Sequence, residues 1–401
     1  MVSGKLEIVV VNTFFVFALF PFVSPVPVNS DVQPIAGSIA LLYFLLRSAL
    51  TGKVPAGLLV GIVFCCFAFI YINPLENVDL QIGKLIALPL ALCTALFIYH
   101  FRKSFSARVF NAAIFIYFLF SLMFVIFPSQ MISIQSLLVR NINVTELGYR
   151  GISTFSTEPG LFGGLLVGLL AINIYFLKLK KIKIGMFIVN TIFIVIMIAM
   201  TKSGSGYAYL LIFIVLLILK NVGVVKFIAS FVVLIAVLTT TSLNQPDMEF
   251  DEVGRGAHTI IRLFAQPELF IQDRSILYRI YAVYVAGISF SQSPAGVGHG
   301  EVKSISQEIV DNDSYLRYFY GSYGENFHPV SSFGFYLTAY GIWFLTPLFL
   351  LFIIKRPILP FAALMISFLL FSYSIAFPIT WFLFAMGVQL NNKKSEYYVR
   401  N

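Results

Sequence analysis

Asp273-Arg274-Ser275-Ile276-Leu277-Tyr278-Arg279 opens the stretch that decides how the chain is organised. The stretch continues through Ser293-Pro294-Ala295-Gly296-Val297-Gly298-His299-Gly300 and ends on His328-Pro329-Val330-Ser331-Ser332-Phe333, with Gly341 thirteen residues after the histidine. On either side of it, long apolar runs are joined mostly by short connections. Here arginines, a glycine-rich turn and histidines replace that pattern. We therefore expect any chemistry to lie in this stretch.

The composition of the chain is that of a membrane protein. Of 401 residues, 59% are hydrophobic and 11% are charged, whereas soluble domains carry about 25% charged residues. The mean hydropathy is +0.90. A chain this apolar cannot bury its apolar surface in a water-soluble core, so we predict an all-α, polytopic integral membrane protein.

Twelve segments are candidate membrane spans, since a span needs roughly 20 mostly apolar residues. They are 8–23, 33–50, 54–72, 82–100, 108–128, 159–177, 184–201, 206–220, 223–241, 333–354, 357–372 and 375–390. The first is expected to be a retained signal anchor. The last two are short, and a re-entrant hairpin is an alternative for them. Either arrangement returns the C-terminus to the same side.

The basic residues predict the orientation of these spans. Every other connection is basic, and together these connections and the termini hold 17 of the 27 lysines and arginines, opposed only by Glu7 and Glu396. Both termini are therefore predicted to be cytoplasmic. The net charge of +9 is then a signal of membrane topology, and no nucleic acid partner is expected.

Two connections on the outer side are long, at about 129–158 and 242–332. They divide the chain into residues 1–241, with spans one to nine; the large outer loop 242–332, expected to carry the active site; and residues 333–401, with the last spans and a cytoplasmic tail. Loops this long are usually functional. Within the large loop, Ser275–Phe290 is predicted to be a helix that lies at or dips into the membrane interface.

Four cations on the outer side adjoin apolar runs: Arg150, Lys202, Arg274 and Arg279. A solvated loop charge is the plain alternative for each of them. A charge at the bilayer boundary is costly unless something pairs with it, and arginine forks match phosphate geometry. These residues are therefore candidates for binding a pyrophosphate headgroup.

His328 is the candidate general base, because it directly precedes a predicted span, where a headgroup would lie. His299 is a weaker candidate for substrate binding. Glu158 directly precedes Pro159 at the start of a span. Two interpretations are equally good: an acid that the helix dipole favours, or a residue that positions Arg150 or a sugar hydroxyl.

No acidic pair has metal-ligand spacing, so a metal-dependent mechanism is not favoured. Cys65, Cys66 and Cys93 all lie in apolar runs, so we interpret them as buried apolar side chains.

The sequence resembles the Wzy-type O-antigen polymerases and, more distantly, the O-antigen ligases of the same superfamily. Four segments carry the resemblance: Arg150–Gly160, Thr201–Gly204, Asp273–Arg279 with Pro294–Gly300, and His328–Gly341. The chain departs from the family pattern at Gly204, where an arginine is usual, and at Pro329, where an asparagine is usual.

The resemblance implies a GT-C-like, inverting glycosyltransferase of the bacterial inner membrane that uses no metal or other cofactor. Its donor and acceptor would be glycans linked to undecaprenyl pyrophosphate in membrane lipid, and a chain-length-regulator protein would be a further partner. His328 would act as general base at the periplasmic face. Arg274, helped by Arg279, Arg150 and Lys202, would stabilise the departing pyrophosphate.

Two other functions stay open. An O-antigen ligase would transfer the same donor glycan to lipid A-core, and the Glu158-Pro159 segment favours the polymerase over it. A lipid-linked oligosaccharide flippase would share the location and substrate but should bury charges at mid-membrane and have short loops.

Overall fold

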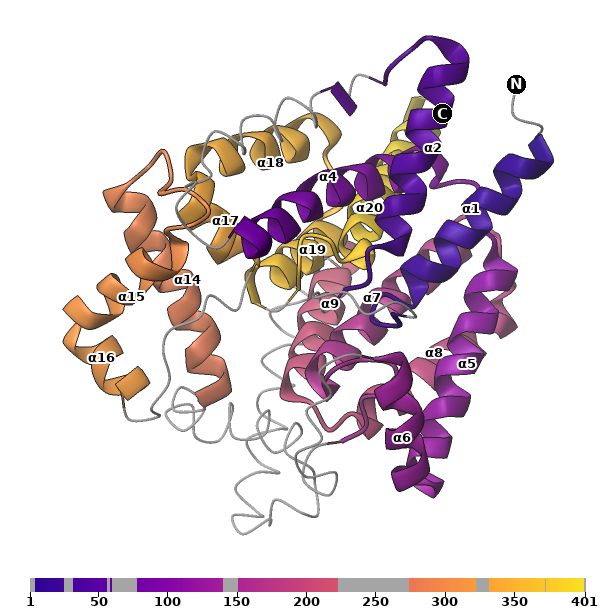
Figure 1. The fold of residues 1–401 in the computed structure, drawn as a ribbon. Coiled ribbons are helices and arrows are strands. Elements are labelled where there is room, and N and C mark those ends of the chain that lie inside the picture. Colours follow the sequence, from indigo (N-terminus) through magenta and orange to yellow (C-terminus); the bar gives the residue numbers. More distant parts are fainter. Residues whose placement is uncertain are drawn as a thin grey trace.

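The computed structural model describes residues 4–24, 32–55, 58–59, 78–139, 151–222, 274–321, 332–371 and 373–399. Over these ranges the named elements are fifteen helices, and one isolated bridge joins Val23 to Val139 (Figure 1). The helices are α1 (Gly4–Leu19), α2 (Ile35–Thr51), α4 (Val78–Phe101), α5 (Ala107–Ile126), α6 (Pro128–Leu138), α7 (Pro159–Lys178), α8 (Ile184–Met200), α9 (Gly204–Val222), α14 (Arg274–Gln292), α15 (Val302–Asn312), α16 (Ser314–Gly321), α17 (Ser332–Tyr340), α18 (Ile342–Lys355), α19 (Leu359–Phe371) and α20 (Pro378–Val399). The predicted all-α class is confirmed.

Several helices are apolar enough to suit a membrane. Ala107–Ile126, Pro159–Lys178 and Ile184–Thr201 are long and apolar enough to cross one, and five further helices are apolar but shorter: Ile35–Thr51, Ala87–Phe101, Gly204–Lys220, Ile342–Lys355 and Leu359–Phe371. Most of the predicted span 54–72 and all of 223–241 lie outside the described residues.

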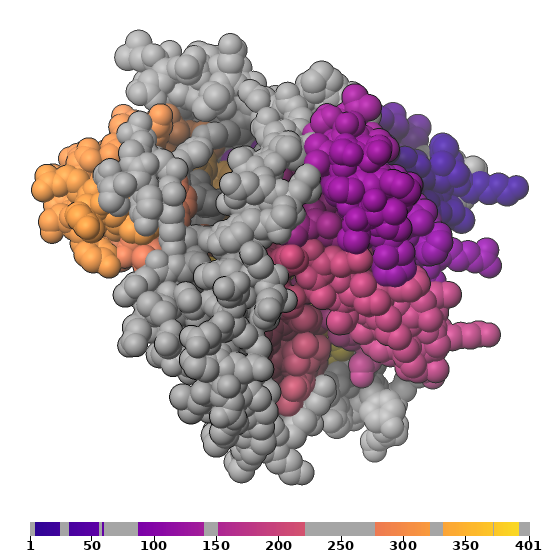
Figure 2. All heavy atoms as spheres, turned by 90° about the horizontal axis from the view of Figure 1, so that it is seen from below, coloured from indigo at the N-terminus to yellow at the C-terminus, as the bar shows by residue number. Residues whose placement is uncertain are grey.

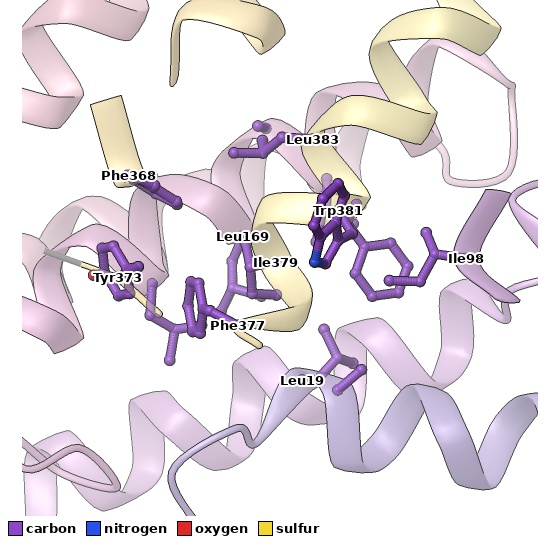
Figure 3. Close-up of a cluster of buried hydrophobic side chains, with 14 of the residues drawn as sticks. Leu19, Ile98, Leu169, Phe368, Tyr373, Phe377, Ile379, Trp381 and Leu383 are labelled. Atoms are coloured by element: carbon purple, nitrogen blue, oxygen red, sulfur yellow. The ribbon is translucent and has the colours of Figure 1, made fainter. Parts of the chain in front are cut away.

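The helix α7 is the centre of the described core. It packs against α8, α9 and α20, and fourteen of its twenty residues are buried, as expected for a helix that is apolar on every side. Figure 3 shows Leu169 of α7 among buried side chains of α19 and α20, including Phe368 and Ile379. The buried cysteine Cys93 of α4 joins the same core, as predicted.

Several of the basic residues predicted for one side of the membrane lie in one region. They make contacts that link the ends of separate helices: Arg47 Nη1 to His100 Nε2 at 2.9 Å, Arg102 Nε to Gln389 Oε1 at 2.8 Å, Lys181 Nζ to the Lys103 carbonyl oxygen at 2.6 Å and Asn391 Nδ2 to the Arg356 carbonyl oxygen at 2.8 Å. The start of α1 and the end of α20 lie at the same end of the molecule (Figure 1). We call this the basic end.

The apolar run 333–354, predicted as one span, is two helices. It breaks at Gly341, whose φ of 51° lies in the left-handed region that favours glycine. A Cβ at Gly341 would also overlap the carbonyl group of Pro294. The single span was therefore wrong, because a contact from a distant loop requires a break that hydrophobicity alone does not reveal.

The two long outer connections contain helices. Within the first lies α6, and within the second lie α14, α15 and α16, so the helix predicted at 275–290 is confirmed. The helix α14 packs against α15, α17 and α19, and Tyr281, Ile309 and Leu316 belong to a separate small core in this lobe. Figures 1 and 2 place α15 and α16 on the opposite side of the molecule from α5 and α8.

Candidate active site

The first turns of α7 and α9 touch through glycine. A Cβ at Gly163 would lie 2.8 Å from the Gly206 Cα, so the two backbones approach as closely as small residues permit. One turn earlier, a Cβ at Gly160 would lie 2.9 Å from Ser205 Oγ and 3.5 Å from Glu158 Oε1. The carboxylate of Glu158 therefore lies close to the start of α9.

The loop before α7 packs on the turn before α9. The Ile152 N–H donates to the Met200 carbonyl oxygen at 3.1 Å, and a Cβ at Gly151 would overlap the backbone of Thr201. In the sequence, Arg150 precedes Gly151 and Lys202 follows Thr201. Two of the segments that carry the family resemblance are thus in direct contact.

A glutamine of α6 holds this loop. The Gln135 Nε2 group donates to Ser153 Oγ at 2.9 Å and to the Ser156 carbonyl oxygen at 2.7 Å. Gln135 is buried, so losing it would leave the Ser156 carbonyl without this bond in a place that water cannot easily reach.

The other two segments also pair with each other. Val297 N–H donates to the Thr338 carbonyl oxygen and Gly298 N–H to that of Ala339, both at 3.0 Å. Gly296 has a φ of 92°, and a Cβ there would overlap the Ala339 carbonyl group. The glycine-rich turn is therefore shaped to dock its backbone on the end of α17.

His299 lies inside this docking contact. Only 4% of its surface is exposed, its Nδ1 is 2.8 Å from the Tyr340 hydroxyl, and its ring packs against Phe335 and Tyr336. The sequence suggested His299 for substrate binding. Its enclosed position favours a different role, which is to anchor the glycine-rich turn to α17.

Tyr373, in the turn between α19 and α20, connects the two pairs of segments. Its side chain is buried, and its hydroxyl donates to the Leu161 carbonyl oxygen in the first turn of α7 at 2.6 Å. Figure 3 shows its ring beside those of Phe368 and Phe377. Two residues later, Ile375 N–H donates to Ser332 Oγ at the start of α17, at 3.0 Å.

The charges of two predicted site residues act on Tyr373. Burial raises the pKa of this phenol well above its ordinary value of 10; Tyr209 and Glu158 raise that pKa further, and Arg279 lowers it. The hydroxyl therefore stays protonated and remains a donor. The carboxylate just before α7 and a guanidinium from α14 both act on the same buried group.

The structure describes only some of the predicted site residues. The charges of Glu158 and Arg279 act on Tyr373, and Lys202 lies in the exposed turn before α9 with a φ of 46°. His299 is enclosed against α17. Arg150 and His328 lie outside the described residues, and Arg274 is described only as the first residue of α14.

Sequence reasoning missed Tyr373, Gln135, Ser205 and Ser332. A signal for Tyr373 was present in α7, because a Cβ at Gly164 would overlap the Tyr373 hydroxyl, and consecutive glycines in an apolar helix indicate close approach by a neighbour. The identity of that neighbour could not be read from the sequence.

The sequence matches no protein-family model and no curated protein. Among the described residues, no three His, Cys, Asp or Glu side chains gather where they could hold a metal ion. The fold and the site define an all-α protein with membrane-suited helices and a polar cluster at the end remote from its basic end.

Proposed function

We propose that this protein is an O-antigen polymerase: an inverting, GT-C-like glycosyltransferase that joins undecaprenyl-pyrophosphate-linked repeat units at the periplasmic face of the inner membrane. One observation carries the proposal. The starts of α7 and α9 pack together, the buried Tyr373 hydroxyl bonds to the first turn of α7, and the charges of Glu158 and Arg279 both act on that phenol.

The cations of this site suit the leaving group. As the bond between the anomeric carbon and the donor pyrophosphate breaks, negative charge grows on the phosphate oxygens. Arg279, Arg274, Arg150 and Lys202 would stabilise that charge, because preorganised donors are worth most where charge develops. The pyrophosphate carries the activation, so the reaction uses no nucleotide sugar.

The acceptor requires a base. Its hydroxyl oxygen forms the new bond to the anomeric carbon from the face opposite the pyrophosphate, which inverts the configuration, and His328 would take the released proton. His328 precedes Ser332 by four residues, and Ser332 accepts the bond from Ile375 beside Tyr373.

Glu158 would orient the substrate or its neighbouring cations. It is half-buried and lies near Ser205. A carboxylate there can accept hydrogen bonds from sugar hydroxyls or from a guanidinium.

The experiment that tests the proposal is a deletion of the gene in its host, followed by a gel of the lipopolysaccharide. The proposed polymerase predicts a single repeat unit on each core, and a return of the ladder when the wild-type gene is restored. Bare core with stored lipid-linked polymer would instead identify a ligase, and bare core with repeat units facing the cytosol would identify a flippase.

A further inference from the structure

The Tyr373 hydroxyl is placed to control the geometry of the site without belonging to the reacting groups. It donates a hydrogen bond to the backbone carbonyl of Leu161 in α7, three residues after Glu158. Its ring is fixed by stacking on Phe377, with centroids 4.3 Å apart, and by packing on Phe368 at 4.6 Å. Because packed interiors are dense and resist deformation, a side chain held this firmly can fix the position of the backbone that it contacts.

Resting on the proposed function, we infer that Tyr373 is a positioning residue: it fixes the start of α7, just after Glu158, against the start of α17. Three contacts support this role. The hydroxyl bonds to Leu161, the neighbouring Ile375 bonds to Ser332, and Gly164 supplies the space that the hydroxyl occupies.

The chain contains matched controls for this hydroxyl. Tyr175 of α7 donates its hydroxyl to the Arg102 carbonyl oxygen at 2.8 Å, and Tyr117 of α5 donates to the Leu19 carbonyl oxygen at 2.8 Å. Both are buried. Removing any of the three hydroxyls deletes the same kind of tyrosine-to-backbone bond, but of the three only the Tyr373 hydroxyl bonds to the start of α7.

The experiment measures kcat and KM of the full-length purified protein, with the lipid-linked repeat unit extracted from the deletion strain as substrate. For Tyr373→Phe we expect kcat to fall by about tenfold to a hundredfold, since small displacements of reacting groups cost this much. KM should stay within about twofold, because the lost interaction is not a substrate contact. Tyr175→Phe and Tyr117→Phe should keep the wild-type kcat.

A second variant covers the case in which Tyr373→Phe does not fold. Ser332→Ala removes the acceptor of the Ile375 bond on the other side of the same turn and should also lower kcat. Wild-type kcat in Tyr373→Phe, or in Ser332→Ala where only that variant folds, would overturn the inference, as would an equal loss of kcat in Tyr175→Phe. If the wild-type chain itself does not extend the substrate, the proposed function fails and the inference fails with it.

Discussion

The backbone N–H of Ile342 donates to the carbonyl oxygen of Pro294 at 2.8 Å. With the bonds from Val297 and Gly298 to the end of α17, it joins the loop after α14 to the junction between α17 and α18, two places 48 residues apart. It explains why an apolar run long enough to span a membrane is interrupted. The interruption holds the glycine-rich turn, and α14 with its Arg279, beside the start of the last helices.

Gly341→Ala should destabilise the protein strongly. The substitution forces alanine into a left-handed backbone conformation and makes its Cβ overlap Pro294. Together these two effects should lower the free energy of unfolding by at least about 2 kcal/mol. Thermal unfolding in detergent measures the effect. Gly52→Ala, which has a φ of 64° but an open surrounding, should cost only the strain, roughly 1 kcal/mol.

Gly287→Ala completes this series. Gly287 lies within α14 with nothing near its Cβ position, so alanine should stabilise the helix by roughly 0.5 to 1 kcal/mol. An unfolding temperature for Gly341→Ala equal to that of Gly287→Ala would show that the Pro294 contact does not form.

Asn190→Ala should destabilise the helices α5, α7 and α8 together. Its Nδ2 donates to Asn111 Oδ1 at 2.8 Å and to Asn173 Oδ1 at 3.1 Å, so one side chain links three helices. Removing it should cost about 1 to 2 kcal/mol, measured by unfolding in mixed micelles. Ser367→Ala is the control, because Ser367 bonds only within its own helix, to Ala363; a similar loss in both variants would contradict the cross-linking role.

More of the helical architecture than of the candidate site could be predicted from the sequence. Hydrophobic length located most helices of the described core, and the basic residues grouped Arg102 with Lys181 at one end because charge is costly within a bilayer. The segment pairs could not be predicted, since a glycine such as Gly151 indicates a close approach without identifying Thr201 as the partner. Tyr373 was missed for the same reason: its role depends on a contact 212 residues away.

Gln135→Leu should lower polymer formation by about tenfold, because the loop 151–158 loses the two bonds that Gln135 donates to it, which displaces Glu158. The length and intensity of the lipopolysaccharide ladder, at matched protein level, measure the effect. Gln130→Leu changes an exposed glutamine of the same helix and should leave the ladder unchanged. A normal ladder in Gln135→Leu would mean that the loop is held by other contacts.

Arg279→Ala should reduce kcat by at least about a hundredfold, since removing one donor to a developing anion typically costs this much. Arg279→Lys should keep a small part of the activity, because a point charge replaces only part of a planar fork. Arg317→Ala removes an exposed arginine of α16 and serves as the control. Activity of Arg279→Ala equal to wild type would argue against a pyrophosphate at this position.

His328→Ala should leave the protein inserted in the membrane but replace the ladder with single repeat units on lipopolysaccharide. Loss of a general base typically lowers the rate by about 10² to 10⁴-fold, enough to stop extension between divisions while the ligation of single units continues. The matched control is His258→Ala, which removes a histidine of the same predicted loop, 242–332, that has no proposed role, and it should leave the ladder intact. Because binding of the lipid pyrophosphate depends on the cations, His328→Ala should lower kcat with little change in KM. An unchanged ladder would remove His328 from the mechanism and leave the proton of the acceptor hydroxyl to another group near Tyr373, with Glu158 the first to test.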